Sequence, residues 1–234
     1  MRFGNDTVPK GISTLQVDRE LERRATVERS NARPPSPGEV AGIVLAAGEG
    51  RKFGGPKALA MLAGQTLVAR ALRTLADGGC RPVVVVLGAA APEVRRECAL
   101  ADAVVVNETW AEGMGGSLRV GLAAAADVGA GAALVTLVDQ PFVTPALVGR
   151  LTAAWRDGAR AAVAAYQGRG RTPVLLDRSL WDEVVEHAVG DRGARALLRA
   201  RPELVTLVDC DDVGAPDDID TPADLRRLAR GFSA

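Results

Sequence analysis

The loop from Leu45 to Lys57, LAAGEGRKFGGPK, combines residue types that bind phosphate. Its four glycines let backbone N–H groups approach an anion closely, because no Cβ atom stands in the way. Arg51, Lys52 and Lys57 add three positive charges within seven residues. This combination indicates a loop that binds a polyphosphate.

The spacing of the same loop disfavours two well-known phosphate-binding fingerprints. In a dinucleotide-binding GxGxxG the third glycine would come one residue before Gly54, and the next apolar run, VVVVLGAAAP, brings no acidic residue for a ribose. A Walker A loop has the pattern GxxxxGK[ST], with glycine directly before the lysine and Ser or Thr after it. Here Pro56 precedes Lys57 and Ala58 follows it, so both positions differ. A nicotinamide site and a P-loop are therefore both disfavoured, while the polyphosphate ligand remains.

A carboxylate follows another apolar run, in the stretch LVTLVDQP. Asp139 comes where this predicted strand ends and just before Gln140 and Pro141, so it would lie where the chain turns. Aspartates are common in turns for purely structural reasons. Beside a basic phosphate loop, however, such a carboxylate suits Mg²⁺, which takes waters and phosphates as its other ligands. We interpret Asp139 as a candidate metal ligand.

The acidic segment DCDDVGAPDDIDTPADL contains a second notable aspartate, Asp220. We interpret most of the other acids as solvated charges. Asp220 differs because the apolar Ile219 precedes it and the helix-start pattern of residues 221–224 follows it, with a Thr cap, a Pro at N1 and an acidic first turn. The pattern fits a ligand at a loop-to-helix junction and also a surface acid beside a capped helix.

Four short apolar runs must position these groups: AGIVLAA, PVVVVLG, DAVVVN and AALVTLV. They are rich in β-branched residues and bounded by Gly, Pro or Asn, which predicts strands buried on both faces. Helical spacing is clearest in TLVARALRTLADGG and predicts further helices near residues 92–99, 116–126 and 145–157. This alternation predicts a three-layer α/β fold with a mostly parallel sheet and helices on both faces. Ligands bind at the carboxyl ends of such strands, which is where these loops fall.

Composition limits the function further. The chain has 234 residues, 47% of them hydrophobic, and 29 basic residues balance 29 acidic ones, so no net charge draws it to nucleic acid or a membrane. Three cysteines and the single His187 disfavour a disulfide framework, a Cys/His zinc site and a Ser-His-Asp triad. With no apolar run of signal-peptide or membrane-spanning type, we expect a cytoplasmic protein.

The first 38 residues differ from the rest, since they are polar and end in the Pro-rich stretch NARPPSPGEV. We predict an N-terminal appendage with a linker over residues 1–38 and one domain over 39–234. Residues 15–30 fit a charged helix about as well as an unstructured tail.

The loop LAAGEGRKFGGPKAL resembles the signature LAAGxSxRMGxxKxL of the MobA-like nucleotidyltransferases. The likeness continues, in the family's order, in NETWAEGMGGSLRVGL, LVTLVDQPFVTPALV, GDRGARALL and DVGAPDDIDTPADL, and it spans about residues 41–230. It is closest to the branch that makes molybdenum cofactor cytidylate. The resemblance implies a Rossmann-like sheet of the nucleotide-diphospho-sugar transferase type.

The resemblance also implies an activity and a site. The enzyme would use Mg²⁺ to move NMP from an NTP, expected to be CTP, to the phosphate of a small acceptor such as molybdopterin or molybdenum cofactor, releasing pyrophosphate. Lys57 would neutralise the α-phosphate and Arg51 the β and γ groups, while Asp139 and Asp220 would hold the metal. A molybdoenzyme or its maturation chaperone would be the protein partner. The nucleotide-binding residues would be Leu45, Ala46, Ala47, Gly48, Gly50, Asn107, Gly116 and Ser117.

One departure from the family concerns the acceptor. Where the branch commonly has GxxGHPV, this chain has GRGRTPVLL, with Arg171 and Thr172 in place of glycine and histidine. Arg169, Arg171, Arg192 and Arg195 could contact a phosphorylated acceptor or could simply be solvated. Two other functions stay open: that of relatives labelled as oxidoreductases of pigment-like substrates, and non-catalytic binding and delivery of a cofactor.

Overall fold

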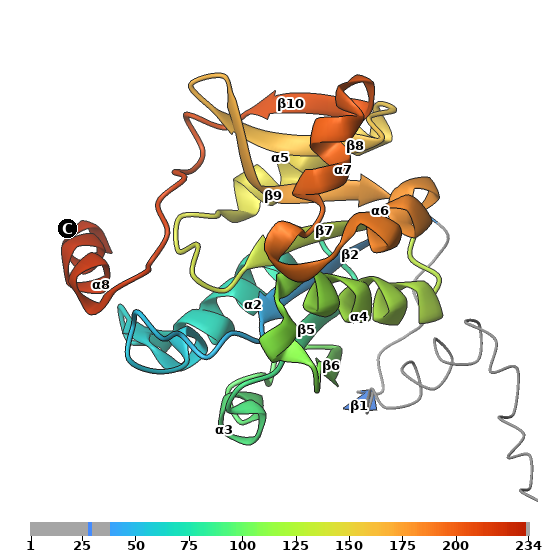
Figure 1. The fold of residues 1–234 in the computed structure, drawn as a ribbon. Coiled ribbons are helices and arrows are strands. Elements are labelled where there is room, and N and C mark those ends of the chain that lie inside the picture. The colour runs from blue at the N-terminus through green and yellow to red at the C-terminus, as the bar shows by residue number, and fades with distance from the viewer. Residues whose placement is uncertain (1–27, 30–37, 233–234) are drawn as a thin grey trace, which may run out of the picture.

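A computed structural model describes residues 28–29 and 38–232, and its centre is an eight-stranded sheet (Figure 1). Strands β1 and β9 run against the other six, so the predicted mostly parallel sheet is confirmed. In spatial order the strands are β1 (Glu28–Arg29), β6 (Ala103–Val106), β5 (Val83–Leu87), β2 (Val40–Ala46), β7 (Ala132–Leu137), β9 (Arg169–Asp177), β8 (Ala161–Tyr166) and β10 (Val205–Asp209).

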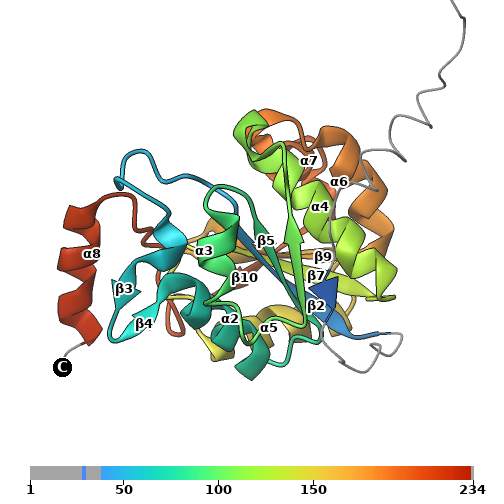
Figure 2. The same cartoon turned by 90° about the horizontal axis from the view of Figure 1, so that it is seen from below.

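Helices cover both faces of this sheet, which gives the predicted three layers (Figure 2). One face carries α2 (Leu67–Asp77), α3 (Ala91–Arg95) and α5 (Pro145–Arg156), and the other carries α4 (Met114–Asp127), α6 (Trp181–His187) and α7 (Arg195–Ala200). Helix α8 (Pro222–Ala229) stands apart, beside the small hairpin of β3 (Met61–Leu62) and β4 (Gln65–Thr66). Short 3-10 helices are η1 (Lys57–Leu59), η2 (Trp110–Glu112), η3 (Arg178–Leu180), η4 (Gly190–Arg192), η5 (Pro202–Leu204) and η6 (Arg230–Phe232).

The central strands are apolar throughout because each of their faces meets a helical layer. Strand β2 shows this directly: Ile43 packs into the core beneath α4, and its neighbour Val44 packs into the core beneath α2 and α5. Strand β6 departs from the prediction, since Val104 and Val106 are only half-buried. It lies towards the edge of the sheet, where only β1 follows it, and its cover is incomplete.

Local signals fix most helix ends. Thr66 caps α2 by accepting a hydrogen bond from the Ala69 N–H, and α2 ends before Gly78 as predicted. Helix α5 begins with Thr144 as its cap and Pro145 in its first turn. Two predicted boundaries were wrong. Helix α3 stops at Arg95 because the chain then continues in tighter i to i+3 turns, and α4 begins at Met114, before the predicted start.

The reversal of β9 was not predicted. It follows from the two-residue turn of Gln167 and Gly168 between β8 and β9, where both residues have positive φ, 51° and 72°. Such a turn joins antiparallel neighbours. As a result, the start of β9 lies at the same end of the sheet as the end of β7.

Most of the predicted appendage lies outside the described residues. Within residues 15–30, for which a charged helix and an unstructured tail both stayed open, Glu28–Arg29 form β1, which pairs with β6. None of the helices in the described part of the chain is long and apolar enough to cross a membrane.

Candidate active site

Three of the residues singled out in the sequence meet at the carboxyl end of the sheet. The ammonium of Lys57 lies between two carboxylates, with Nζ 2.8 Å from Asp139 Oδ2 and 2.6 Å from Asp220 Oδ1. The side chains of Lys57 and Asp139 are 15% and 17% exposed, and that of Asp220 is 61% exposed. Asp139 and Asp220 follow Lys57 by 82 and 163 positions in the chain, yet the three side chains form one charged cluster.

The glycine-rich loop delivers Lys57 to this cluster. The carbonyl of Gly50 accepts hydrogen bonds from the N–H groups of Phe53, Gly54 and Gly55, which closes the loop on itself before η1 begins with Lys57. Gly50 has a φ of +68°, and a Cβ atom there would overlap the carbonyl oxygen of Gly55. The loop conformation therefore requires glycine at position 50.

Asp139 is presented by a tight turn after β7. Gln140 N–H donates to the Leu137 carbonyl at 3.3 Å, and Val138 N–H donates to the carbonyl of Leu45 at 3.1 Å, which ties the turn to the start of the glycine-rich loop. The Asp139 carbonyl in turn accepts from Ile219 N–H at 2.9 Å. This bond brings the next residue, Asp220, to the site.

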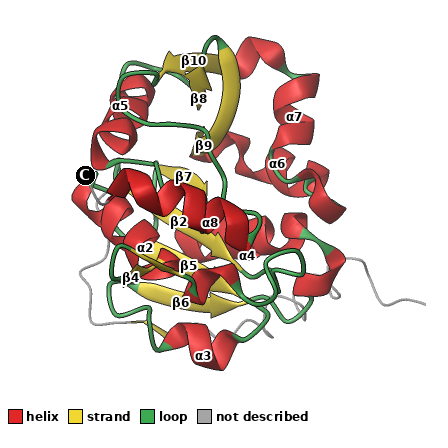
Figure 3. Cartoon of the chain, turned by 90° about the vertical axis from the view of Figure 1, so that its left-hand side faces the viewer, coloured by secondary structure: helices red, strands yellow, loops and turns green. Residues whose placement is uncertain are grey.

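Asp220 lies between two anchors. Before it, Ile219 is fully buried in a small apolar cluster with Leu62, Leu67 and Leu228, beneath α8. After it, Thr221 and Asp224 form a reciprocal capping box at the start of α8, where the sequence predicted a Thr cap and an acidic first turn. Figure 3 shows α8 in front of the sheet, where these anchors hold it.

Burial and neighbouring charges shift the pKa values of Lys57 and Asp218. Burial alone would lower the pKa of Lys57, but its hydrogen bonds and charge contacts with Asp139 and Asp220 raise it above the usual value. Burial raises the pKa of a third carboxyl, Asp218, and the nearby charge of Asp139 adds to this effect. Lys57 is therefore firmly protonated, and the site holds more negative charge than its one ammonium balances.

The donor set fits a hard divalent cation. Asp139 Oδ1 is buried and accepts no hydrogen bond from the described residues, although a buried carboxylate oxygen is normally paired. Among the described residues, no three His, Cys, Asp or Glu side chains gather as a closed metal site. Mg²⁺ and Mn²⁺ commonly take one or two carboxylates from a protein, while phosphates and waters supply the other ligands. Asp139, with an oxygen that is unpaired in the described part of the chain, and Asp220 could be these carboxylates.

A second polar pair lies at the end of β6. Asn107 and Ser117 are 4% and 3% exposed, and Asn107 Nδ2 donates to Ser117 Oγ at 3.0 Å. The backbone N–H and hydroxyl of Thr109 both donate to Asn107 Oδ1. Gly116 packs closely here, since a Cβ atom on it would lie 3.2 Å from Asn107 Nδ2. The structure thus brings together three of the residues that the resemblance placed on the nucleotide.

Other predicted site residues lie differently. The Arg51 side chain is 83% exposed and pairs with Glu49, not with the cluster of Lys57. Leu45 and Ala46 are the last residues of β2 and pair with β5, whereas Ala47, Gly48 and Gly50 lie in the loop beyond. The four arginines considered for the acceptor, Arg169, Arg171, Arg192 and Arg195, are all exposed.

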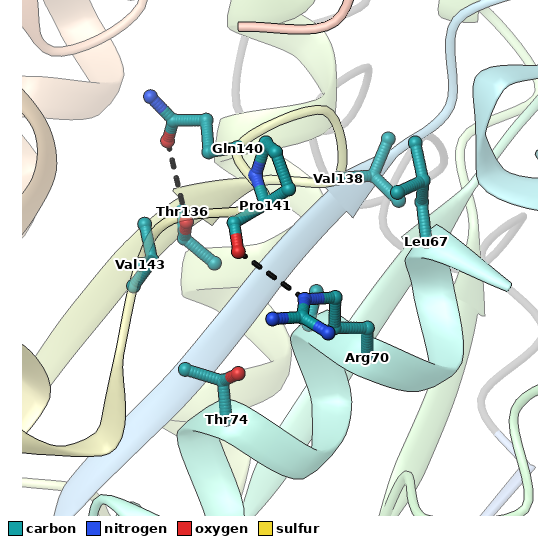
Figure 4. Close-up of a pocket in the computed structure, with 9 residues that line it drawn as sticks. Leu67, Arg70, Thr74, Thr136, Val138, Gln140, Pro141 and Val143 are labelled. Atoms are coloured by element: carbon teal, nitrogen blue, oxygen red, sulfur yellow. Dashed lines mark hydrogen bonds between the residues drawn. The ribbon is translucent and has the colours of Figure 1, made fainter. Parts of the chain in front are cut away.

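Sequence reasoning missed Gln140 as part of this region. Its side chain contacts Thr136, Thr172 and Asp218. Figure 4 shows Gln140 above a small cavity between α2 and the end of β7, where the Arg70 guanidinium donates to the Pro141 carbonyl at 3.2 Å. The cavity has room for about one water and is therefore too small for a nucleotide.

The fold is that of the α/β nucleotidyltransferases. Within that class, residues 42–205 match the MobA-like NTP transferase domain, and the chain belongs to this family of nucleotidyltransferases. The resemblance read from the spaced motifs is thereby confirmed.

Individual relatives carry different names. The chain is 43% identical over 201 residues to "Nicotine blue oxidoreductase" of Paenarthrobacter nicotinovorans, covering 81% of this chain and 96% of that protein. It is 38% identical over 124 residues to "Probable molybdenum cofactor guanylyltransferase" of Opitutus terrae, covering 53% of this chain and 59% of that one. Among solved structures, Rv0371c of Mycobacterium tuberculosis in complex with manganese is 30% identical with a TM-score of 0.67, covering 82% of this chain and 98% of that chain.

Proposed function

We propose that this protein moves a nucleoside monophosphate from CTP to the phosphate of a small acceptor of the molybdopterin or molybdenum cofactor type, releasing pyrophosphate. The observation that carries the proposal is the meeting of Lys57 with Asp139 and Asp220 beside a glycine-rich loop, in a chain of the MobA-like family. The product would pass to a molybdoenzyme or to its maturation chaperone.

In this reaction an oxygen of the acceptor phosphate attacks the α-phosphorus of the nucleotide. A new P–O bond forms, the bond between the α-phosphorus and the bridging oxygen breaks, and pyrophosphate leaves with the electron pair. Lys57, charged and partly desolvated, would stabilise the growing negative charge on the α-phosphate. To reach that phosphate, its ammonium must leave at least one of the two carboxylates that it now contacts.

Asp139 and Asp220 would hold a divalent cation, Mg²⁺ in our proposal. When bound, such an ion neutralises phosphate charge and orients the phosphates. The assignment is supported by Asp139 Oδ1, which has no hydrogen-bond partner among the described residues, and by the manganese complex of a related structure. The residues of the second pair, Asn107 and Ser117, would lie towards the nucleoside, where polar atoms can select a base.

A second candidate function is oxidation or reduction of a pigment-like substrate. It is favoured by one observation, the 43% identity to a relative named for that activity. Such an enzyme would need a hydride or electron carrier. The spacing of Gly48, Gly50 and Gly54 does not fit the dinucleotide fingerprint, so we place this function second.

The deciding experiment incubates the full-length protein with each of the four NTPs, Mg²⁺ or Mn²⁺, and molybdopterin or molybdenum cofactor. Pyrophosphate release and the mass of the nucleotidylated acceptor are measured. We expect turnover with CTP, and an Asp139→Asn variant serves as the inactive control. Turnover only with GTP would correct the nucleotide.

Two other outcomes would replace the proposal. Stabilisation by an NTP without turnover on any acceptor would indicate a binding and delivery protein. Oxidation of NADH or NADPH with a pigment substrate, retained in Asp139→Asn, would establish the second candidate function.

A further inference from the structure

The sheet opens at the point where it presents Asp139. Strand β7 pairs with β9 only from Ala132 to Val135, so its last two residues, Thr136 and Leu137, have no partner in β9. On its other side, β9 shifts register against β8, where Val174 faces Val163 and Arg171 faces Ala164. Thr172 and Pro173 therefore leave the regular ladder, and β9 is not paired with the end of β7.

The side chain of Gln140 bridges this separation. Its Oε1 accepts from the Leu137 N–H at 3.2 Å. The same oxygen accepts from the Thr136 hydroxyl at 3.3 Å (Figure 4). Its Nε2 donates to the Thr172 hydroxyl oxygen at 2.7 Å. One amide thus joins the end of β7 to β9 where backbone bonds do not, and it does so within the turn that carries Asp139.

The same amide reaches the segment that carries Asp220. Gln140 Nε2 also donates to Asp218 Oδ1 at 3.2 Å, and one residue further on, the Ile219 N–H donates to the Asp139 carbonyl. The residues on either side of this backbone bond are therefore both held, one by the Gln140 side chain and one by the Lys57 ammonium on Asp220. Gln140 and Asp139 are adjacent in the chain, so this link joins the turn that carries Asp139 to the segment that carries Asp220.

We infer that Gln140 is a positioning residue that sets Asp139 and Asp220 at the distance one cation needs. The inference rests on the proposed function of those two carboxylates. An amide suits this place because it accepts at one end and donates at the other. A glutamate would keep the shape, lose the donors and place a negative charge beside Asp218.

The test exchanges the amide of Gln140 and the carboxylate of Asp218, first singly and then together. Gln140→Glu should weaken binding of the Mn²⁺ complex of CTP, measured by calorimetry, by about 10- to 100-fold, as is typical when a partner of a metal ligand is lost. Asp218→Asn keeps an acceptor for Gln140 and should change affinity less. In Gln140→Glu with Asp218→Asn, the asparagine amide donates to the glutamate and the Thr172 hydroxyl can turn to donate as well. This double variant should recover affinity to within about threefold of wild type.

A matched control and a second measurement complete the test. Gln167→Glu makes the same change at the exposed tip of the β8–β9 turn and should bind Mn²⁺–CTP as wild type does. Hydrogen exchange of a peptide over residues 216–221 reports the Ile219 N–H without any ligand. We expect faster exchange in Gln140→Glu and normal exchange in the double variant.

The outcomes separate the inference from the proposed function. A double variant that binds no better than Gln140→Glu, or exchange unchanged by Gln140→Glu, would overturn the positioning role. If wild type itself does not bind Mn²⁺–CTP, the proposed use of CTP fails, and the exchange data alone then decide whether Gln140 holds the segment.

Discussion

Two aspartates lie near opposite ends of the β7–β9 pair and differ in how completely they are bonded. Asp177 ends β9 opposite Ala132, the first residue of β7, and Asp139 follows the last residue of β7 by two positions. Asp177 Oδ1 accepts from the N–H and hydroxyl of Ser179, and Oδ2 accepts from Trp155 Nε1 at 2.7 Å. Asp139 has one oxygen on Lys57 and one with no hydrogen bond among the described residues.

The difference separates an aspartate whose hydrogen bonds are complete within the fold from one that we propose binds a metal ion. Burial would raise the pKa of Asp177, but hydrogen bonds from Ser179 and Trp155 lower it below the usual value. Its charge is used within the protein, where it caps η3 and fixes Trp155. Asp139 is more than four-fifths buried and still has an open oxygen, which a fold selected for stability alone would pair.

The largest effect is expected from removing the charge of the proposed metal ligands. Asp139→Asn and Asp220→Asn should each lower the rate of transfer at least about a hundredfold, and the double variant should lose little more, because ligands that act as a unit are not additive. Titration of Mg²⁺ with NTP present measures the metal dependence of each variant. Unchanged metal affinity in both single variants would exclude the shared site, and additive losses would indicate two separate sites.

Lys57→Ala comes next in size and should affect nucleotide and metal in opposite ways. NTP binding should weaken and transfer should slow by about a hundredfold, because alanine supplies no charge for the phosphate. Without nucleotide, however, Mn²⁺ should bind at least as well as in wild type, since the ammonium that now contacts both carboxylates is gone. Electron spin resonance of free Mn²⁺ measures this. Loss of Mn²⁺ binding together with NTP binding would mean that Lys57 supports the site structurally.

Asp177→Asn should show the reverse behaviour, a loss of stability with no loss of function. We expect a cost of about 1–2 kcal/mol, since charged hydrogen bonds to Ser179 and Trp155 are weakened, and unchanged Mn²⁺–NTP binding. Because the folded-state pKa lies below the usual 3.8, this stability is present above pH 3.8 and is lost as the pH falls through the folded-state value. Denaturant unfolding at neutral and acid pH measures it, and a difference that persists at the acid limit would contradict the assignment.

Features that depend on local sequence pattern could be predicted from the sequence alone. Apolar runs predicted strands β2, β5, β6 and β7, and the helix start after Asp220 followed from its cap, proline and acidic first turn. Lys57 could be selected because a lysine in a glycine-rich loop suits phosphate. Asp139, after a strand, and Asp220, before a helix, could be selected because their carboxylates suit a metal, and the family motifs coincide with all three residues.

The rest depends on contacts between distant side chains. The bonds of Gln140 to Thr172 and Asp218 span 32 and 78 positions. The bond to Thr172 depends on the reversal of β9, which places the start of β9, not itself paired with β7, near the end of β7. Nothing in the types of Asp139 and Asp177 tells them apart; their neighbours in space do. For the same reason the exposed position of Arg51 was not foreseen, since a charged loop residue can face a ligand or solvent.

The smallest effect is expected at the edge of the sheet, far along it from both aspartates. We propose that residues 1–38 are an appendage to a domain over 39–234. The strand pairing described between them joins Glu28 and Arg29 to Val104 and Ala103. Deleting residues 1–36 removes this short ladder, so it should cost at most about 1 kcal/mol and leave NTP binding unchanged. Thermal melting and calorimetry measure the two effects.

Deleting residues 1–27 provides the matched control, because it keeps Glu28–Arg29 and therefore the pairing with β6. If the short ladder is the whole contribution, the longer deletion should melt slightly lower than the shorter one, which should melt like wild type. A large loss in both deletions, or a change of oligomeric state, would mean that the first 27 residues contact the domain or a second subunit. The difference between Asp139 and Asp177 should survive either deletion, since the bonds of both aspartates come from residues of the domain itself.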